Sequence, residues 1–408
     1  MPDPPLITPT FVLAWLVNFF QYLLFYLLVT TVALYAVKEF AASDAASGLA
    51  ASSFVIGATV ARLFAGYVVD VLGRRRVMVS AIVIVTVACA LYLVAGTLPL
   101  LIAVRLLHGF GYAFASTALM AIAQAAIPPR RRAEGTGYYA LGSTLATAVG
   151  PALGLFLVQS FTYGILFWVT LGTAVLGLVL GLFLRQPAAQ RQAAAAAASA
   201  ARQEGRTPPA PRFSFRDIAH PAVVPIGTFM LLVGLCYAGV ITYLNAYAEQ
   251  RDVVTGASLF FLAYAATMLV MRFVLGRVQD RHGDNVVVYL GLVSFALALA
   301  LLAAATADWQ IVLAGALTGL GYGTLMPACQ AIAVSAVPAD KLGTGISTML
   351  LFMDVGLGVG PIVLGILVSA TSYGTMYALL AAVAVIAAVL YHLVHGRHEV
   401  AKQGRAAA

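Results

Sequence analysis

Charged side chains are missing from most of this sequence, and their absence leaves few possible folds. Residues 77–104 contain no Asp, Glu, Lys or Arg, and in all 408 residues these types make up 9% while 62% are hydrophobic. A helix of about twenty apolar residues spans a bilayer core of about 30 Å. The chain divides into twelve such stretches, approximately residues 11–37, 47–72, 77–96, 98–127, 136–160, 163–184, 221–248, 256–279, 285–305, 309–336, 343–369 and 372–395. The sequence therefore predicts a polytopic membrane protein.

The spans are predicted to be helices. The alternation of polar and apolar residues that a membrane barrel requires does not occur, and a helix satisfies its own backbone groups in lipid. The opening MPDPPLITPT has no basic segment and no small-residue cleavage site, so we expect the first span to be a retained helix. One cysteine lies in each of three distant spans, and we expect Cys89, Cys236 and Cys329 to be small core residues.

The net charge of +8 reports topology and does not indicate a nucleic-acid partner. If the amino terminus is cytoplasmic, 18 of the 23 Lys and Arg residues fall in cytoplasmic segments. Basic loops stay on that side of a membrane. We therefore expect a multi-pass protein of the inner (plasma) membrane with both termini in the cytoplasm.

The chain contains an internal repeat. Shifting the sequence by 210 residues superimposes GYVVDVLGRRR (66–76) on GRVQDRHGDNV (276–286), and HGFGYA at 108 on TGLGYG at 318. The coinciding residues are Arg62 with Arg272, Gly66 with Gly276, Asp70 with Asp280, and Gly73 with Gly283. We expect a six-helix bundle over residues 1–184, a cytoplasmic linker over 185–220, a second bundle over 221–396 and a tail over 397–408. Parallel repeats of this size are a transporter architecture.

With these motifs in place, the sequence resembles the major facilitator superfamily. The family's loop motif reads approximately G-x-x-x-D-x-x-G-R-[RK], which GYVVDVLGRRR matches at Gly66, Asp70, Gly73, Arg74 and Arg75. The resemblance covers about residues 10–395 and implies twelve helices in two six-helix repeats. It also implies that this motif forms an inner latch between two rocking halves, in which Asp70 can accept hydrogen bonds from the amino terminus of a neighbouring helix. Alternatively, the arginines only anchor the loop in the cytoplasm.

Three further groups are candidates for proton coupling. Asp354 alone among fifteen carboxylates lies well inside a span, about twelve residues from its start, and an acid within the membrane is a functional-site hypothesis. Arg105 and His108 lie within the fourth span, where the former resembles the family's membrane-embedded arginine. Asp354 could instead be a structural acid neutralised by an arginine. By the helical rise Arg62 lies at a similar depth, and because the family fold places the two helices face to face, we expect Arg62 and Asp354 to pair. Alternatively, Arg62 only packs its stem beside the loop and binds carbonyl groups.

The fifth span carries GSTLATAVGPALGL, residues 142–155. It resembles the G-x8-G-P-x-x-G signature of drug and metabolite antiporters at Gly142, Gly150, Pro151 and Gly154, and departs from the fuller pattern at Leu155. The resemblance favours export over uptake, although any Gly-Pro pair can kink a helix.

Polar, aromatic and methionine side chains occur on the helices that line the substrate cavity in this family, and they suit an amphipathic compound. They are Asn18, Gln21, Tyr22, Tyr26, His108, Tyr112, Met120, Tyr237, Tyr243, Asn245, Tyr322, Met326 and Gln330. Any one of them could equally be a packing residue.

The leading interpretation is a monomeric, proton-driven antiporter that exports a small amphipathic organic compound and needs no cofactor. The alternative is a proton symporter that takes up a sugar or an organic acid. The sequence lacks the motifs of a membrane enzyme or of an ATP-binding loop, so we expect no enzymatic activity. His392, His395 and His398 are spaced by three, which could ligate a metal, but a basic helix end at the membrane surface is the favoured interpretation.

Overall fold

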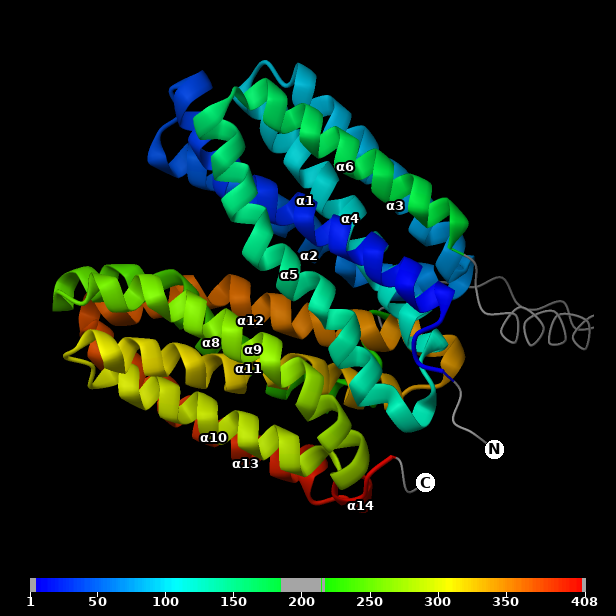
Figure 1. Ribbon diagram of the computed structural model, residues 1–408, viewed down its shortest axis with the longest axis vertical. Coiled ribbons are helices and arrows are strands. Elements are labelled where there is room, and N and C mark those ends of the chain that lie inside the picture. The colour runs from blue at the N-terminus through cyan, green and yellow to red at the C-terminus, as the bar shows by residue number, and fades with distance from the viewer. Residues whose placement is uncertain (1–4, 185–213, 215–216, 406–408) are drawn as a thin grey trace, which may run out of the picture. The chain divides into compact units, whose positions relative to one another are not determined.

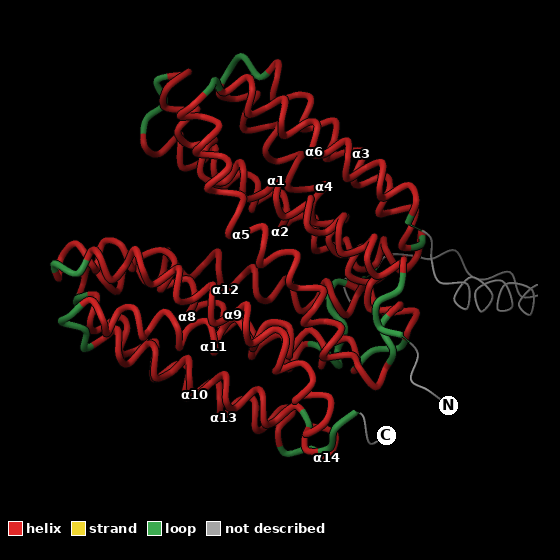
Figure 2. Tube along the Cα trace, viewed as in Figure 1, coloured by secondary structure: helices red, strands yellow, loops and turns green. Residues whose placement is uncertain are grey.

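Helices account for nearly all of the ordered structure (Figures 1 and 2). The computed structural model describes residues 5–184, 214 and 217–405. Within these residues, twelve helices are long and apolar enough to cross a membrane, and no strand occurs. The predicted all-helical, twelve-span fold is confirmed. The predicted linker over residues 185–220 lies almost entirely outside the described residues.

The two halves of the chain contain matching sets of helices. The first six are α1 (Pro9–Phe40), α2 (Asp44–Leu72), α3 (Arg74–Leu91), α4 (Leu98–Ala126), α5 (Arg132–Ser160) and α6 (Tyr163–Phe183). The second six are α8 (Val224–Arg251), α9 (Val254–His282), α10 (Asp284–Ala303), α11 (Asp308–Ser335), α12 (Leu342–Ala370) and α13 (Tyr373–Tyr391). Each of α9 to α13 begins 210 residues after its counterpart among α2 to α6, so the duplication seen in the sequence is also a duplication of structure.

The helix boundaries follow from local sequence signals. The side chain of Thr162 accepts a hydrogen bond from the Ile165 amide at the start of α6, and Ser372 caps α13 through Thr375 in the same way. A single glycine separates α2 from α3 and α9 from α10. Gly73 and Gly283 have φ angles of 92° and 93°, a conformation that glycine adopts without the steric cost of a Cβ.

The structure divides into two units. Unit 1 comprises residues up to Ile127, Leu145–Ala219 and Ala339–Ser347, and unit 2 comprises Pro128–Thr144, His220–Pro338 and the residues from Thr348 onward. The beginnings of α5 and α12 therefore belong to the unit that holds the other repeat. Fully buried aromatic side chains occupy the interior of each unit: Tyr92 in unit 1, and Phe229, Tyr247, Phe295, Tyr377 and Tyr391 in unit 2.

Several charged residues that were expected in loops lie inside helices. Arg74, Arg75 and Arg76 form the first turn of α3, and α5 begins at Arg132 and includes Glu134. A span predicted from apolarity stops at the first charge, whereas a helix continues as long as its backbone hydrogen bonds and side-chain contacts favour it. The carboxy-terminal segment also differs from a plain helix end, because a π-helical turn (His392–Gly396) precedes the short helix α14 (Glu399–Lys402).

Candidate gating and coupling site

Asp70, near the end of α2, contacts the first turn of α12. Its Oδ1 accepts a hydrogen bond from the Gly343 amide at 2.7 Å, and its Oδ2 accepts from the amide and the hydroxyl of Thr344 at 2.8 and 2.7 Å. The amides of a first turn have no partner within the helix and carry partial positive charge. A carboxylate at this place satisfies them, and we call the group Asp70, Gly343 and Thr344 the first latch.

Glycines bring the helices of the first latch into backbone contact. A Cβ on Gly66 would lie 2.6 Å from the Cα of Thr344 and 2.9 Å from the carbonyl oxygen of Gly343. A Cβ on Gly343 would lie 2.6 Å from Oδ1 of Asp70. Neither position can accept a side chain without separating α2 from α12, so both glycines are required for the contact.

The arginines that follow the first latch bind backbone carbonyl groups. Arg74 donates to the carbonyl oxygen of Ala339 and interacts electrostatically with Asp70 and Asp340. Arg75 donates through Nε and Nη2 to the carbonyl groups at the end of α6, each at 2.9 Å. Cations are favourable at a helix carboxy terminus, so Arg75 ties α3 to α6 while Arg74 supports the first latch.

Unit 2 contains the equivalent arrangement around Asp280 of α9. Its two oxygens accept hydrogen bonds from the amides of Ala133 and Glu134, at 3.0 and 2.8 Å, in the first turn of α5. A Cβ on Gly276 would lie 2.7 Å from the Cα of Glu134. We call Asp280, Ala133 and Glu134 the second latch. Its members are related to those of the first latch by the 210-residue shift.

Glu134 gives the second latch two ion pairs that the first latch lacks. Its carboxylate contacts Nε of Arg131 and Nε of Arg277, both at 2.7 Å. The arginine side chains are 33% and 56% exposed, so solvent screens both pairs. Thr344 occupies the same place in the first latch and contributes its hydroxyl instead.

Arg62 and Arg272 are both buried, and each lies four residues before the first glycine of its loop motif. Arg62 is 5% and Arg272 is 7% exposed. The hydroxyl of Ser347 donates to the carbonyl oxygen of Arg62 at 2.7 Å, whereas a Cβ on Gly137, the equivalent of Ser347, would lie 3.3 Å from the carbonyl oxygen of Arg272. Asp354 is partly buried near the middle of α12. The pairing of Arg62 with Asp354 stays a prediction.

Arg105 is fully buried in unit 1 and is held by groups that carry no formal charge. Its Nη2 donates to the carbonyl oxygen of Ala51 at 3.1 Å, and its guanidinium carbon lies 5.0 Å from the centre of the Phe54 ring, within cation–π range. His108, also fully buried, places Nδ1 3.2 Å from the Tyr92 hydroxyl. Within the described residues, Nε and Nη1 of Arg105 and Nε2 of His108 have no hydrogen-bond partner.

The glycines of the antiporter-like motif pack α5 against α1 in unit 1. A Cβ on Gly150 would collide with Tyr26, and one on Gly154 would lie 2.7 Å from the carbonyl oxygen of Leu27. Gly142 is buried as well. Seven residues separate Gly142 from Gly150, whereas the antiporter signature has eight. The prediction that Gly142 matches the first glycine of this signature is therefore wrong. The resemblance rests on Gly150, Pro151 and Gly154.

Several of the predicted cavity residues of unit 1 lie together. The rings of Tyr22 and Tyr26 are 6.4 Å apart, and those of Tyr22 and Tyr112 are 5.7 Å apart. Asn18 and Gln21 on the same helix are 2% and 1% exposed, and neither polar side-chain atom of Gln21 has a hydrogen-bond partner in the described part of the chain. Met120 is buried further along α4 and accepts a contact from Gln124 at 3.8 Å.

Unit 2 contains a second aromatic cluster. The rings of Tyr237 and Tyr322 stack with centroids 3.7 Å apart, and the Tyr237 hydroxyl donates to that of Tyr264 at 3.3 Å. The Tyr322 hydroxyl lies 4.0 Å from the sulfur of Met353, the residue before Asp354. This stack therefore joins α8, α9 and α11 to the segment of α12 that carries Asp354.

The remaining predicted cavity residues lie on α8 and α11. Tyr243 donates to the carbonyl oxygen of Pro361 at 2.5 Å, which makes it a packing contact between α8 and α12. Asn245 is exposed near the end of α8, Met326 is partly buried, and Gln330 is 8% exposed on α11.

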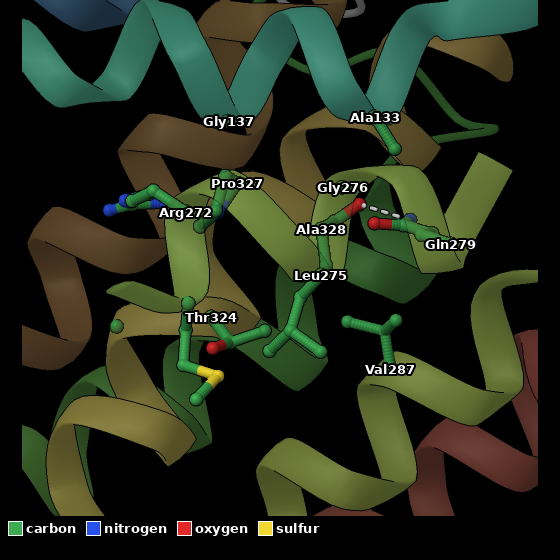
Figure 3. Close-up of a pocket in the computed structure, with 12 residues that line it drawn as sticks. Ala133, Gly137, Arg272, Leu275, Gly276, Gln279, Val287, Thr324, Pro327 and Ala328 are labelled. Atoms are coloured by element: carbon green, nitrogen blue, oxygen red, sulfur yellow. Dashed lines mark hydrogen bonds between the residues drawn. The ribbon is translucent and has the colours of Figure 1, made fainter. Parts of the chain in front are cut away.

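A small hollow lies beside the second latch (Figure 3). Residues of α5, α9, α10 and α11 line it, among them Arg272, Gln279 and Thr324. The Gln279 amide donates to the carbonyl oxygen of Ala328 at 3.2 Å across this hollow. The space lies between the helices that the second latch holds together.

The sequence predicts a helix amino terminus as the partner of Asp70, but the residues that bind Asp70 and Asp280 were missed. The signal was available, because Ala133 and Glu134 coincide with Gly343 and Thr344 under the shift that relates Asp70 to Asp280. The contacts of two of the three histidines were also not foreseen: His395 contacts Asp284 at 2.9 Å, and His392 contacts the Tyr289 hydroxyl at 2.9 Å. In the residues that the structure describes, no group of three His, Cys, Asp or Glu side chains is placed to hold a metal ion.

Two parallel six-helix repeats, each with a carboxylate bound to the first turn of a helix of the other repeat, define the class of secondary membrane transporters. The chain belongs to the Major Facilitator Superfamily, whose sequence model matches residues 14–266 and 253–407. The resemblance inferred from the sequence is confirmed, and the chain is a multi-pass membrane transporter.

Relatives of similar length are transporters of the same family. An uncharacterised MFS-type transporter of Methanocaldococcus jannaschii is 20% identical over 385 residues, which cover 93% of this chain and 96% of that protein. One of Salmonella typhimurium is 25% identical over 394 residues, covering 93% and 95%.

Two solved structures share the fold. The human organic anion transporter MFSD10 (TETRAN) has a TM-score of 0.79 at 17% identity, covering 94% of this chain and all of that one. The proton:xylose symporter XylE, solved with 6-bromo-6-deoxy-D-glucose, has a TM-score of 0.74 at 15% identity, covering 97% of each chain.

Proposed function

We propose that this transporter is a proton-driven antiporter that exports a small amphipathic organic compound from the cytoplasm by alternating access. The observation that carries the proposal is the place of Asp354. Every other carboxylate in the described helices lies within three residues of a helix end, whereas Asp354 is the thirteenth residue of the 29-residue helix α12. An acid at this depth is costly to bury, and its presence there supports a role in ion or proton movement.

Alternating access requires contacts that form and break as the repeats rock. The two latches have the chemistry for this role. In each latch one carboxylate accepts hydrogen bonds from backbone amides, and water can take over these hydrogen bonds when the helices separate. In the proposed orientation, with both termini in the cytoplasm, both latches lie on the cytoplasmic side. Their closure blocks that side while the opposite side is open.

An amphipathic substrate suits the side chains available. The stack of Tyr237, Tyr322 and Tyr264 and the group around Tyr22 present aromatic faces together with hydroxyl groups, which contact an apolar body and bind a polar substituent. The Gly150–Pro151 pair and Gly154, which resemble the antiporter motif, support export over uptake.

Proton release from everted membrane vesicles tests the proposal. Respiration acidifies the lumen, a fluorescent dye reports its pH, and a panel of amphipathic cations, neutral compounds and carboxylates is added from outside. Export by antiport predicts that at least one compound raises the lumenal pH, and that vesicles with Asp354→Asn give no such response.

The uptake alternative predicts a different sign. A symporter that runs backwards in the same vesicles carries protons inward with its substrate, so added sugar or organic acid would lower the lumenal pH. A fall in pH with such a compound, or an unchanged response in Asp354→Asn vesicles, would contradict the proposed antiport.

A further inference from the structure

The second latch differs from the first in its balance of charge. Arg74 follows Asp70 by four residues, but the equivalent residue after Asp280 is Asp284. Asp280 and Asp284 are only 4% and 1% exposed. Both carboxylates lose their hydration on burial and carry like charge, so a cation that contacts both is stabilising.

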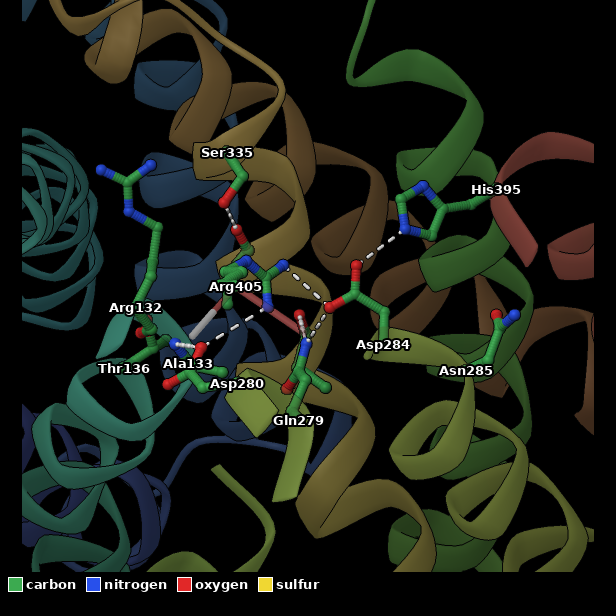
Figure 4. A network of polar contacts seen from close by, with 12 residues as sticks. Arg132, Ala133, Thr136, Gln279, Asp280, Asp284, Asn285, Ser335, His395 and Arg405 are labelled. Atoms are coloured by element: carbon green, nitrogen blue, oxygen red, sulfur yellow. Dashed lines mark hydrogen bonds and ion pairs between the residues drawn. The ribbon is translucent and has the colours of Figure 1, made fainter. Parts of the chain in front are cut away.

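The carboxy-terminal tail supplies a cation that contacts both acids, and Arg132 also interacts electrostatically with Asp280 (Figure 4). Nη2 of Arg405 lies 2.8 Å from Oδ1 of Asp284, and Nη1 lies 3.6 Å from Oδ1 of Asp280. The arginine side chain is only 16% exposed. Asp284 is further bound by Gln279 at 2.8 Å and by His395 at 2.9 Å. The tail arginine thus contacts both acids, whereas Arg74 in the first repeat interacts electrostatically with Asp70.

The backbone of the tail packs closely against the turn between α9 and α10. A Cβ on Gly283 would lie 2.7 Å from the carbonyl oxygen of Ala401, and one on Gly404 would collide with the carbonyl oxygen of Arg281. Asn285 donates to the carbonyl oxygen of Gly396 at 2.8 Å. Backbone therefore packs directly on backbone where the tail crosses the turn between α9 and α10, and Arg405 is held at the end of this path.

Arg405 acts on the latch through Asp280. The same Oδ1 of Asp280 that faces Arg405 accepts the hydrogen bond from the Ala133 amide in α5. We propose that Arg405 is a positioning residue that completes the second latch, in place of the arginine that the first latch has in its own loop. Without it, the paired acids repel, Asp280 shifts, and the first turn of α5 leaves α9 more often.

Thiol accessibility at Ala133 tests this role without any substrate. Ala133 is 2% exposed and lines the hollow beside the latch, so Ala133→Cys has room for its sulfur and is covered while the latch is closed. In a background with the three native cysteines replaced, we expect Arg405→Ala to raise the maleimide labelling rate about tenfold, the effect of losing one charge-assisted hydrogen bond. Arg405→Lys should give a smaller rise.

The matched control is Lys402→Ala, because Lys402 lies on the same tail and pairs with the exposed Glu399. It should leave the labelling rate within about twofold of the parent, the range of an exposed ion pair. Equal rates for Arg405→Ala and Lys402→Ala would overturn the proposal.

A rescue separates this role from simple anchoring of the tail. Combining Arg405→Ala with Asp284→Arg restores the first-repeat arrangement, and combining it with Asp284→Asn removes the second acid. Either double variant that folds should return labelling to near the parent rate. If the folded double variants stay as reactive as Arg405→Ala, the charge of Arg405 is not what holds the latch. Because labelling needs no substrate, this result is independent of whether transport proceeds by antiport.

Discussion

Thr344 binds Asp70 twice, through its amide at 2.8 Å and through its hydroxyl at 2.7 Å. A hydrogen bond to a charged group contributes about 1.5–3 kcal/mol. Substitutions can separate the two contacts, because only the hydroxyl belongs to the side chain. We expect Thr344→Val, which removes only the hydroxyl, to slow transport about tenfold or more. Asp70→Ala removes all acceptors and should abolish it. Initial rates in proteoliposomes measure both, and equal effects would show that the hydroxyl carries the whole contact.

Adding a methyl group at either latch glycine should stop transport without unfolding the protein. Gly66→Ala and Gly276→Ala place a Cβ less than 3 Å from backbone atoms of Thr344 and Glu134, and backbone cannot move aside as a side-chain tip can. Gly172→Ala is the control, since no atom lies within 4 Å of its added Cβ. Gel filtration monitors folding and vesicle transport monitors activity. Normal transport by Gly66→Ala would mean that the helices are not in contact during the cycle.

Removing the charge of Glu134 should reduce the transport rate less than removing the charge of Asp280. Glu134→Gln weakens ion pairs with Arg131 and Arg277, which are partly exposed and contribute about 1 kcal/mol or less. Asp280→Asn alters two buried bonds to helix amides. We expect at most about a fivefold loss of transport rate for the former and a much larger loss for the latter. The opposite ranking would place the function of the second latch in its ion pairs.

The proposed orientation predicts labelling from opposite sides of the membrane. Ser199 lies in the expected cytoplasmic linker, outside the described residues, and Thr255 is exposed at the start of α9. With the native cysteines replaced, an impermeant maleimide added to intact cells should label Thr255→Cys and leave Ser199→Cys unlabelled until the cells are opened. Labelling of Ser199→Cys in intact cells would contradict a cytoplasmic linker.

Much of the architecture could be predicted from the sequence, because a helix must be apolar over about twenty residues to cross a membrane. The lengths of the apolar stretches predicted the twelve spans. The 210-residue shift, which places Gly66 on Gly276 and Asp70 on Asp280, predicted the two repeats. Helix ends were less predictable. Arg74 and Glu134 carry charge and therefore seemed to lie outside the spans, yet their contacts with Ala339 and with Arg131 and Arg277 keep them within helices.

The site residues were predictable in part, for a similar reason. A motif indicates which carboxylate matters, but its partner depends on how distant helices pack. Thr344 and Ala133 could have been found by applying the repeat to the whole chain. Arg405 could not, because no residue pattern in the tail predicts that it crosses Gly283 and reaches Asp284. The exposure of Asn245 and the contact of Tyr243 with Pro361 likewise depend on how α8 packs, which residue type alone does not fix.

Transport by Asp354→Asn under an imposed pH gradient tests the account most directly. A carboxamide keeps the size of the side chain and removes its titratable proton, so the protein should fold, bind the compound found in the vesicle screen and exchange it across the membrane. It should fail to accumulate that compound when a pH gradient is imposed on proteoliposomes, whereas the parent protein accumulates it. Accumulation by Asp354→Asn at the parent level would contradict coupling through this residue and, with it, the proposed mechanism.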